Sequence, residues 1–236
     1  MLLLNKHIVV TGAASGLGAA IAHACLEEGA EVTSIDLKET GFCPSRVADV
    51  SNEEQVQSAF ADLERIDALV NSAGVVRRAA VADTSLEDFD MVLNINLRGA
   101  FLTSKYALPH LADHGGSILH LASVVGLTGM RRRSSYSASK GGLVALTRNM
   151  ALDYAHRGIR INCLCPGFIK TPLLESLLRD PGRMAQLTAL HPLGRLGDAS
   201  DVADAAVFLL SEKAKWITGQ ALAVDGGFSA GHAADV

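Results

Sequence analysis

The sequence has few aromatic residues and no long apolar run. Its 236 residues include seven Phe, three Tyr and one Trp. A binding pocket built from stacked rings is therefore not expected. No apolar stretch reaches the ~20 residues that a membrane-spanning helix needs. We therefore expect no association with a membrane.

An excess of charge of one sign is also missing. The net charge is −4 and the pI is about 6.0, whereas proteins held to nucleic acid or anionic membranes by charge are basic. We therefore expect no nucleic-acid partner. Residues 1–6 become polar too early for a signal peptide, which indicates a cytoplasmic protein.

Cysteine is scarce, with four residues: Cys25, Cys43, Cys163 and Cys165. The last two are two positions apart in an apolar run that is typical of a strand, so they would share one face with a residue between them. That spacing suits neither a disulfide nor a zinc site. We expect reduced thiols and no bound metal.

The apolar segments alternate between strand and helix patterns. Hydrophobic residues make up 49% and charged residues 19% of the chain, as in globular proteins. Strands are predicted at 7–11, 31–35, 46–50, 66–70, 117–122, 159–165 and 220–224, and helices at 17–28, 53–64, 86–101, 136–156 and 199–210. With no strong hairpin signal, this order predicts an α/β fold, one doubly wound domain over residues 1–236. The mixed segment 168–197 is predicted to be a substrate lid.

A glycine-rich turn joins the first predicted strand to the first helix at residues 12–18. Glycines allow a tight turn and a close approach of backbone to ligand, and the start of the helix presents free N–H groups. The pattern predicts a phosphate-binding turn, although a turn without a ligand has the same local signature. The candidate contacts are Gly12, Ser15, Gly16, Leu17 and Gly18.

Asp36 stands at the end of the second predicted strand, where a carboxylate accepts hydrogen bonds from both hydroxyls of an adenosine ribose. It would repel a 2′-phosphate, and the glycine turn contains no Arg or Lys. The pattern predicts NAD rather than NADP; the alternative is an Asp that caps a loop. Asp49, beside Val50, is predicted either to bond an adenine amino group or to begin the next helix.

Tyr136 and Lys140 are four residues apart in a predicted helix, so they lie on one face, one turn apart. An ammonium beside a phenol favours the phenolate and lowers a tyrosine pKa that is ordinarily near ~10. The pair predicts a proton donor and acceptor, with the Ser123 hydroxyl available to hold a substrate oxygen. The alternative is a surface pair without chemistry.

Together these motifs resemble the classical short-chain dehydrogenases/reductases over nearly the whole chain. The resemblance rests on Thr11-Gly12-x-x-x-Gly16-x-Gly18, Asn71-Ser72-Ala73-Gly74, Asn96-Leu97-x-Gly99, Ser123, Tyr136-x-x-x-Lys140 and Pro166-Gly167. It implies a Rossmann-type sheet of seven parallel strands and a catalytic tetrad of Asn96, Ser123, Tyr136 and Lys140. The further cofactor contacts that it implies are Asn71, Ala73, Gly74, Pro166, Gly167, Ile169 and Thr171. Ser72 departs from the family's usual second Asn, which puts one strand-stabilising hydrogen bond in doubt.

The function that follows is NAD-dependent interconversion of a secondary alcohol and a ketone on a small substrate. A polyol, sugar, cyclic alcohol or hydroxy acid fits this description. The alternative within the family is a 3-oxoacyl-carrier-protein reductase that uses NADPH. A cofactor-sensing binding protein without turnover is the alternative from another class.

Two arginine clusters flank the predicted site, at residues 77–78 and at Arg131, Arg132 and Arg133. Such clusters bind a carboxylate, phosphate or sulfonate by paired hydrogen bonds, or they form a solvated or subunit-contact surface. The predicted pocket wall is aliphatic, with Val125, Leu127, Met130, Leu173 and Leu174.

The resemblance also implies a homotetramer, with a dimer left open. Family members associate through the helices that correspond to residues 86–101 and 136–156. In the second helix, the small side chains of Ala145, Ala151 and Ala155 are the expected contacts.

Overall fold

The computed structural model describes residues 1–111, 115–172, 174 and 180–231. Seven parallel strands form one sheet in the order β3-β2-β1-β4-β5-β6-β7. The strands are β1 His7–Thr11, β2 Glu31–Asp36, β3 Ser45–Val47, β4 Ala68–Asn71, β5 Gly116–Leu121, β6 Ile159–Pro166 and β7 Ala221–Val224. The predicted α/β architecture with a seven-stranded parallel sheet is confirmed.

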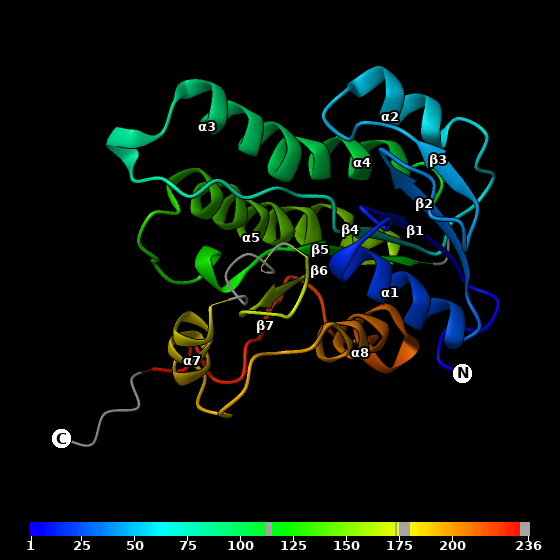
Figure 1. The fold of residues 1–236 in the computed structure, drawn as a ribbon. Helices are drawn as coiled ribbons and strands as arrows, with labels where there is room; N and C mark the ends of the chain where they lie inside the picture. The colour runs from blue at the N-terminus through cyan, green and yellow to red at the C-terminus, as the bar shows by residue number, and fades with distance from the viewer. Residues whose placement is uncertain (112–114, 173, 175–179, 232–236) are drawn as a thin grey trace.

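Helices cover both faces of the sheet (Figure 1). On one face lie α1 Gly16–Glu27 and α8 Ala199–Leu210, which pack against each other. The opposite face carries α2 Glu53–Phe60, α3 Leu86–Leu93, α4 Gly99–Ala107 and α5 Ser134–Tyr154. Because both faces are covered, the central strands are buried: all four residues of β4 are inaccessible to solvent or nearly so. This explains why the strands have continuous apolar runs rather than alternating ones.

The predicted helix over 86–101 is interrupted. A π-helical turn, Asn94–Arg98, joins α3 to α4. Asn94 and Asn96 are poor helix formers, and π turns inside helices are frequent at functional sites. The wider turn places Asn96 inward, where only 1% of its surface is exposed.

Other boundaries differ by a few residues. The third strand ends at Val47 rather than at residue 50, because the Asp49 carboxylate accepts hydrogen bonds from the Ser51 N–H and hydroxyl at 2.8 and 2.7 Å. Those bonds bend the chain out of the sheet toward α2. The remaining short helices are Val81–Asp83, Val124–Gly126, Ala155–Arg157 and Glu212–Ala214.

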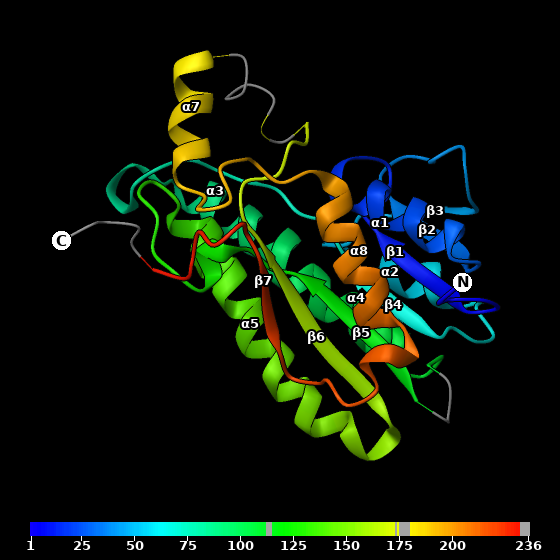
Figure 2. The same ribbon diagram turned by 90° about the horizontal axis from the view of Figure 1, so that it is seen from below.

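The segment after β6 leaves the carboxyl edge of the sheet and returns to it. Its two ends are joined, because the Lys170 N–H donates to the Gly197 carbonyl at 2.9 Å and the Gly197 N–H to the Phe168 carbonyl at 3.0 Å. Between them, α7 Pro181–Ala189 buries none of its residues and stands away from the sheet (Figure 2). Leu173, predicted as a pocket residue, lies outside the described residues.

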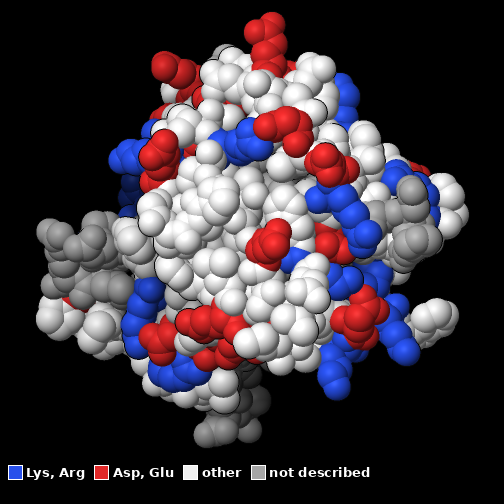
Figure 3. Space-filling view, turned by 90° about the vertical axis from the view of Figure 1, so that its right-hand side faces the viewer, with Lys and Arg blue, Asp and Glu red and all other residues white. Residues whose placement is uncertain are grey.

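Over the part of the chain that the structure describes, no helix has the length and apolar character needed to cross a membrane. Acidic and basic side chains are interspersed on the face shown in Figure 3.

Candidate active site

The glycine turn after β1 is shaped by close backbone contacts. Gly12 has φ +70°, and a Cβ on it would lie 2.7 Å from the Cα of Ala73. A Cβ on Gly18 would collide with the Gly12 carbonyl oxygen, whereas Gly16, at φ +58°, has open space in front of it. Glycine is therefore required here by conformation and by contact. The open side at Gly16 leaves room for a dinucleotide, so the residues present fit a nicotinamide cofactor.

A groove of about 390 Å³ runs from this turn along the carboxyl edge of the sheet. Most of the predicted cofactor residues line it: Gly12, Ser15, Gly16, Leu17, Gly18, Asp36, Asp49, Val50, Ala73, Gly74, Tyr136, Lys140 and Thr171. Pro166, Gly167 and Ile169 line the pocket that adjoins it. Among the described residues lining the groove, Lys140 is the one cation.

Asp36 is fixed at the mouth of the groove by two backbone donors. Its Oδ2 accepts from the Ala14 N–H at 2.9 Å and its Oδ1 from the Lys38 N–H at 3.3 Å. Each oxygen keeps a further lone pair for a ligand hydroxyl. The Asp36 carboxylate therefore has two roles. It holds the glycine turn in place, and it presents negative charge to the groove.

The turn after β4 is fixed by hydrogen bonds to buried side chains. The N–H groups of Ser72 and Ala73 both donate to the buried Thr11 hydroxyl at 3.1 Å. The Asn71 side chain points away from the groove, where its Oδ1 accepts from Thr103 at 2.6 Å and its Nδ2 donates to Ser104 at 3.0 Å. Asn71, predicted as a cofactor contact, therefore positions the turn from the side opposite the groove. The Asn71 amide and Thr11 are the groups that hold the turn in a chain that has Ser72 in place of the second Asn.

His120 completes that buried network. Its Nδ1 lies 3.1 Å from the Asn71 Nδ2, which makes Nδ1 the acceptor. Burial, with the Lys140 charge nearby, lowers the pKa of His120 to about 4. The ring is thus neutral at working pH and adds no charge beneath the site.

Lys140 lies on α5, one turn after Tyr136, and is almost completely buried. Its Nζ donates to the Leu121 carbonyl at 2.6 Å and lies 5.6 Å from the centroid of the Tyr136 ring. Burial lowers the pKa of Lys140 to about 8. The Leu121 carbonyl, at the end of β5, is therefore part of the site, although no sequence motif marks a backbone carbonyl in advance.

The pKa of Tyr136 departs from expectation. Burial raises it, and the contributions that lower it come from the Ser123 hydroxyl and the Arg133 charge. The predicted lowering by Lys140 is wrong for this structure, because the ammonium is directed to the Leu121 carbonyl and the phenol is desolvated. Among the predicted catalytic residues, Ser123 is the one whose hydroxyl faces the phenol and lowers its pKa.

Asn96 clamps the chain beside Gly74. Its Oδ1 accepts from the Val75 N–H at 2.8 Å, while its Nδ2 donates to the Val75 carbonyl at 2.9 Å and to the Ser139 hydroxyl at 3.0 Å. A Cβ on Gly74 would lie 3.2 Å from the Asn96 Oδ1 and 3.6 Å from the Lys140 Nζ. Gly74 thus separates an amide oxygen from an ammonium, and both N–H donors of Asn96 are already used.

A second pocket, of about 110 Å³, opens beside Tyr136 and Ser123. Its wall is mostly apolar, with Leu17, Val76, Ala122, Val124, Val125, Met130, Phe168 and Leu174. Two guanidinium groups, those of Arg78 and Arg133, also line it. An apolar pocket with a few polar groups beside a cofactor groove is the usual form of a substrate site.

The predicted substrate residues divide between this pocket and the surface. Val125, Met130, Arg133 and Leu174 line the pocket. Arg131, Arg132 and Leu127 are exposed and do not line it. Val76 and Phe168 escaped the sequence analysis because single apolar residues in irregular segments carry no periodic signal.

An aromatic cluster adjoins the pocket and contributes one ring to its wall. Phe168, His191 and Phe228 contact one another with ring centroids 5.7 to 6.0 Å apart. Phe168 and Tyr136 are the two rings in the pocket wall. All four cysteines are free thiols, as expected.

Comparisons with known proteins extend over nearly the whole chain. A family profile described as enoyl-(acyl carrier protein) reductase matches residues 12–229. The 2-(S)-hydroxypropyl-CoM dehydrogenase 3 of Xanthobacter autotrophicus is 38% identical, over 97% of this chain and 98% of that protein. The 3-oxoacyl-(acyl-carrier-protein) reductase FabG of Thermotoga maritima is 36% identical, over 96% of this chain and 99% of that protein.

Solved structures give the same result. The ligand-free aldohexose dehydrogenase of Thermoplasma acidophilum superposes with a TM-score of 0.94 at 32% identity, covering 99% of this chain and 98% of that one. A protein assigned as a 2-deoxy-D-gluconate 3-dehydrogenase from Agrobacterium tumefaciens, with bound NADP, superposes with a TM-score of 0.92 at 33% identity, covering 97% and 98%.

Proposed function

The chain belongs to the short-chain dehydrogenase/reductase family, and we propose that it interconverts a secondary alcohol and a ketone on a small substrate with NAD(H). The observation that carries the proposal is the meeting of the Tyr136 phenol and the Ser123 hydroxyl in a small apolar pocket that adjoins the cofactor groove. A bound nicotinamide supplies or accepts the hydride. The chain's own residues supply the proton chemistry and the orientation.

In the oxidation direction, Tyr136 as phenolate takes the proton of the substrate hydroxyl, and in reduction the phenol returns it. Ser123 orients the substrate oxygen next to the phenol. Lys140 is held by the Leu121 carbonyl. It provides positive charge near the phenol and would donate a hydrogen bond to the nicotinamide ribose. The Asn96 Oδ1 keeps a free lone pair, and this oxygen would accept a hydrogen bond from a water that exchanges protons with Lys140.

A panel of secondary alcohols and ketones, each with NAD(H) and with NADP(H), tests this function by absorbance at 340 nm. We expect turnover of at least one alcohol–ketone pair with NAD(H). Cofactor binding without an absorbance change across the panel would contradict an enzyme and would instead support a cofactor-sensing binding protein.

Asp36 supports NAD over NADP. Its carboxylate faces the groove where a ribose 2′-hydroxyl would lie, and the described residues that line the groove beside it include no Arg or Lys to neutralise a 2′-phosphate. The nearby Lys38 bonds Asp36 through its backbone N–H, and its side chain is exposed outside this lining. Two negative groups at this place would repel each other.

A 3-oxoacyl-carrier-protein reductase using NADPH is the second candidate. The similarity to the Thermotoga maritima reductase and the exposed Arg131 and Arg132 beside the pocket favour it, because an acidic carrier protein docks on basic surface. Asp36 opposes it. Faster turnover of an acyl-carrier-protein thioester with NADPH than of any free ketone with NADH would decide for this candidate.

The residues between Phe168 and Gly197 are proposed to act as a substrate lid. Their two ends are clamped together at the pocket, and α7 has no buried residue to hold it in one place. Segments with few buried contacts are the ones that move on ligand binding.

Alcohol oxidation is expected to become faster as the pH rises from 6 to 10. The reaction needs the deprotonated Tyr136, and burial raises the pKa of that phenol, so only a small fraction is ionised near neutrality. Initial rates at saturating cofactor measure this. A flat profile would contradict Tyr136 as the base unless product release limits the rate.

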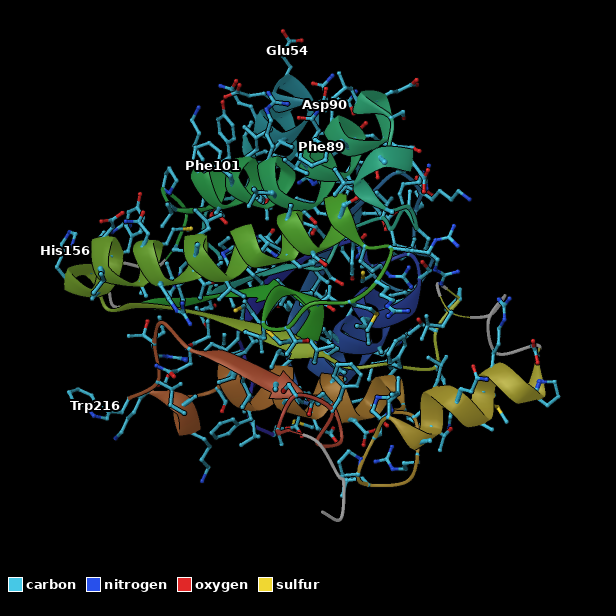
Figure 4. The ribbon with its side chains drawn as sticks, turned by 90° about the vertical axis from the view of Figure 1, so that its left-hand side faces the viewer. Glu54, Phe89, Asp90, Phe101, His156 and Trp216 are labelled. Atoms are coloured by element: carbon cyan, nitrogen blue, oxygen red, sulfur yellow. The ribbon has the colours of Figure 1, made fainter. Side chains whose placement is uncertain are left out.

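A homotetramer is proposed from the exposed apolar surface on the π-helical turn, α4 and α5. Leu97, Phe101, Ala145 and Leu146 line a shallow depression there, and Figure 4 shows Phe101 on the outer side of the helices. Ala151 was also expected to contact a neighbouring subunit, but it is buried in this chain's own core. Trp216, 97% exposed, projects from a separate edge. It would supply the second apolar contact that a second two-fold axis of a tetramer needs.

The variant Phe101→Glu is expected to form an assembly of fewer subunits, because the substitution would bury a charge in the contact between subunits. Light scattering after gel filtration measures the mass. Val81→Glu, at a residue 80% exposed outside α4 and α5, is the control and should leave the mass unchanged. An unchanged mass for Phe101→Glu would contradict this contact.

A further inference from the structure

Two arginines from distant parts of the sequence line the substrate pocket together with Tyr136. Arg78 follows the turn after β4, and Arg133 directly precedes α5. The two charges lie near enough that Arg78 lowers the pKa of Arg133, in addition to the effect of burial. Two like charges drawn together at a half-buried site destabilise the protein unless something compensates them.

No carboxylate compensates them in the part of the chain that the structure describes, although the Arg133 Nη1 donates to the Arg132 carbonyl at 3.1 Å. Neither guanidinium lies within salt-bridge distance of a described Asp or Glu, and the buried Nε–H of Arg78 has no hydrogen-bond partner. The neighbouring Arg77 differs, because its Nε donates to Asp88 at 3.0 Å on the surface. Buried polar groups without partners are rare in folded proteins and often mark a missing ligand.

The start of α5 adds to the positive field on this side of the pocket. Its first turn has no acidic residue, and Arg133 at the N-cap position makes no capping hydrogen bond with its side chain. The first N–H groups of a 21-residue helix carry positive partial charge. The pocket therefore has an apolar wall and a proton-transfer group, with uncompensated positive charge beside them.

We propose that Arg78 and Arg133 bind the carboxylate of the substrate, so that the enzyme acts on a short hydroxy acid and its keto acid. This inference rests on the proposed function: the carbinol carbon lies at Tyr136 and Ser123, and the acid group reaches the two guanidiniums. Guanidinium groups recognise planar carboxylates by paired hydrogen bonds. The pocket, about 110 Å³, is smaller than the ~150 Å³ that holds a benzene ring. The acid must accordingly be short.

The test compares 3-hydroxybutanoate with two neutral analogues, 3-hydroxybutanamide and 1,3-butanediol, and with 3-hydroxybutane-1-sulfonate. The variants are Arg78→Gln and Arg133→Gln, with Arg77→Gln as the matched control. We expect each pocket variant to raise KM for the hydroxy acid about ten- to a hundredfold, because a charge-assisted hydrogen bond is lost. KM for the neutral alcohols should change less than about twofold. Arg77→Gln should leave all the constants as they are.

Thermal unfolding without substrate separates binding from a structural role. Because each variant removes one of two uncompensated like charges, the melting temperature should stay the same or rise. A clear fall would show that the arginine stabilises the fold and would overturn the inference for that residue.

Other outcomes are equally decisive. Equal kcat/KM for the hydroxy acid and the neutral alcohols in the wild-type protein would overturn the inference and leave the proposed function intact. A preference for the sulfonate would overturn the choice of a carboxylate. An equal effect of Arg131→Gln or Arg132→Gln would place the anion site on the loop rather than in the pocket.

If no alcohol is oxidised with either cofactor, the proposed function fails by itself. Calorimetric titration of butanoate into the wild-type protein and Arg78→Gln then still tests the pair. Binding that is weakened by the substitution would support the anion site, and equal or absent binding would overturn it.

Discussion

Tyr136→Phe is expected to lower kcat about a thousandfold while leaving the cofactor dissociation constant almost unchanged. General acid–base catalysis contributes about a hundred- to ten-thousandfold in enzymes, and phenylalanine keeps the ring while removing the group that exchanges the proton. The phenol hydroxyl contacts the Ser123 hydroxyl, and the Lys140 Nζ lies 5.6 Å from the ring centroid, so a variant that keeps the ring also keeps the packing of the site. Initial rates at 340 nm and fluorescence titration of the cofactor measure the two quantities.

Tyr154→Phe is the matched control, since Tyr154 ends α5 and is distant in sequence from the site. It should keep full activity. Survival of turnover within tenfold in Tyr136→Phe would show that Tyr136 is not the proton-transfer group. A large loss of cofactor affinity would show that the hydroxyl acts in binding rather than in catalysis.

Asp36→Asn is expected to shift the ratio of kcat/KM for NAD to that for NADP by about a hundredfold toward NADP. The amide keeps an acceptor for the Ala14 N–H, so the glycine turn stays in place. It removes the charge that strengthens hydrogen bonds to the ribose and repels a 2′-phosphate. The loss for NAD and the gain for NADP act in the same direction.

The measurement is the specificity ratio of the wild-type protein and the variant with one substrate. Glu39→Ala removes a carboxylate three residues further along the chain and should leave the ratio unchanged. A wild-type enzyme that prefers NADP, or a ratio that Asp36→Asn does not change, would contradict the role given to Asp36.

The fold and the position of the catalytic pair follow from local patterns. Continuous apolar runs separated by helical segments predicted the parallel sheet, because strands covered on both faces must be apolar throughout. The conformation and close contacts of Gly12 and Gly18 permit only glycine, so their positions in the sequence already marked the turn. The four-residue spacing of Tyr136 and Lys140 placed both on one face of α5 for the same geometric reason.

The ionisation of the site depended on surroundings that the sequence does not contain. Spacing alone suggested that Lys140 lowers the pKa of Tyr136. In the folded protein, the Leu121 carbonyl takes the ammonium and burial raises the pKa of the phenol. Desolvation depends on every element packed around a group, and those elements come from distant parts of the chain.

The same limit applies to the arginines. Five were visible in two clusters, yet only Arg78 and Arg133 line the pocket, while Arg77 pairs with Asp88 and Arg132 turns outward at φ +59°. Adjacent residues in irregular segments have no fixed period, so their directions follow from backbone angles that only the packed structure sets. The nicotinamide-binding α/β fold and its Tyr–Lys pair therefore follow from local sequence patterns alone. The charges that surround that pair are set by the packing of distant segments in the folded protein.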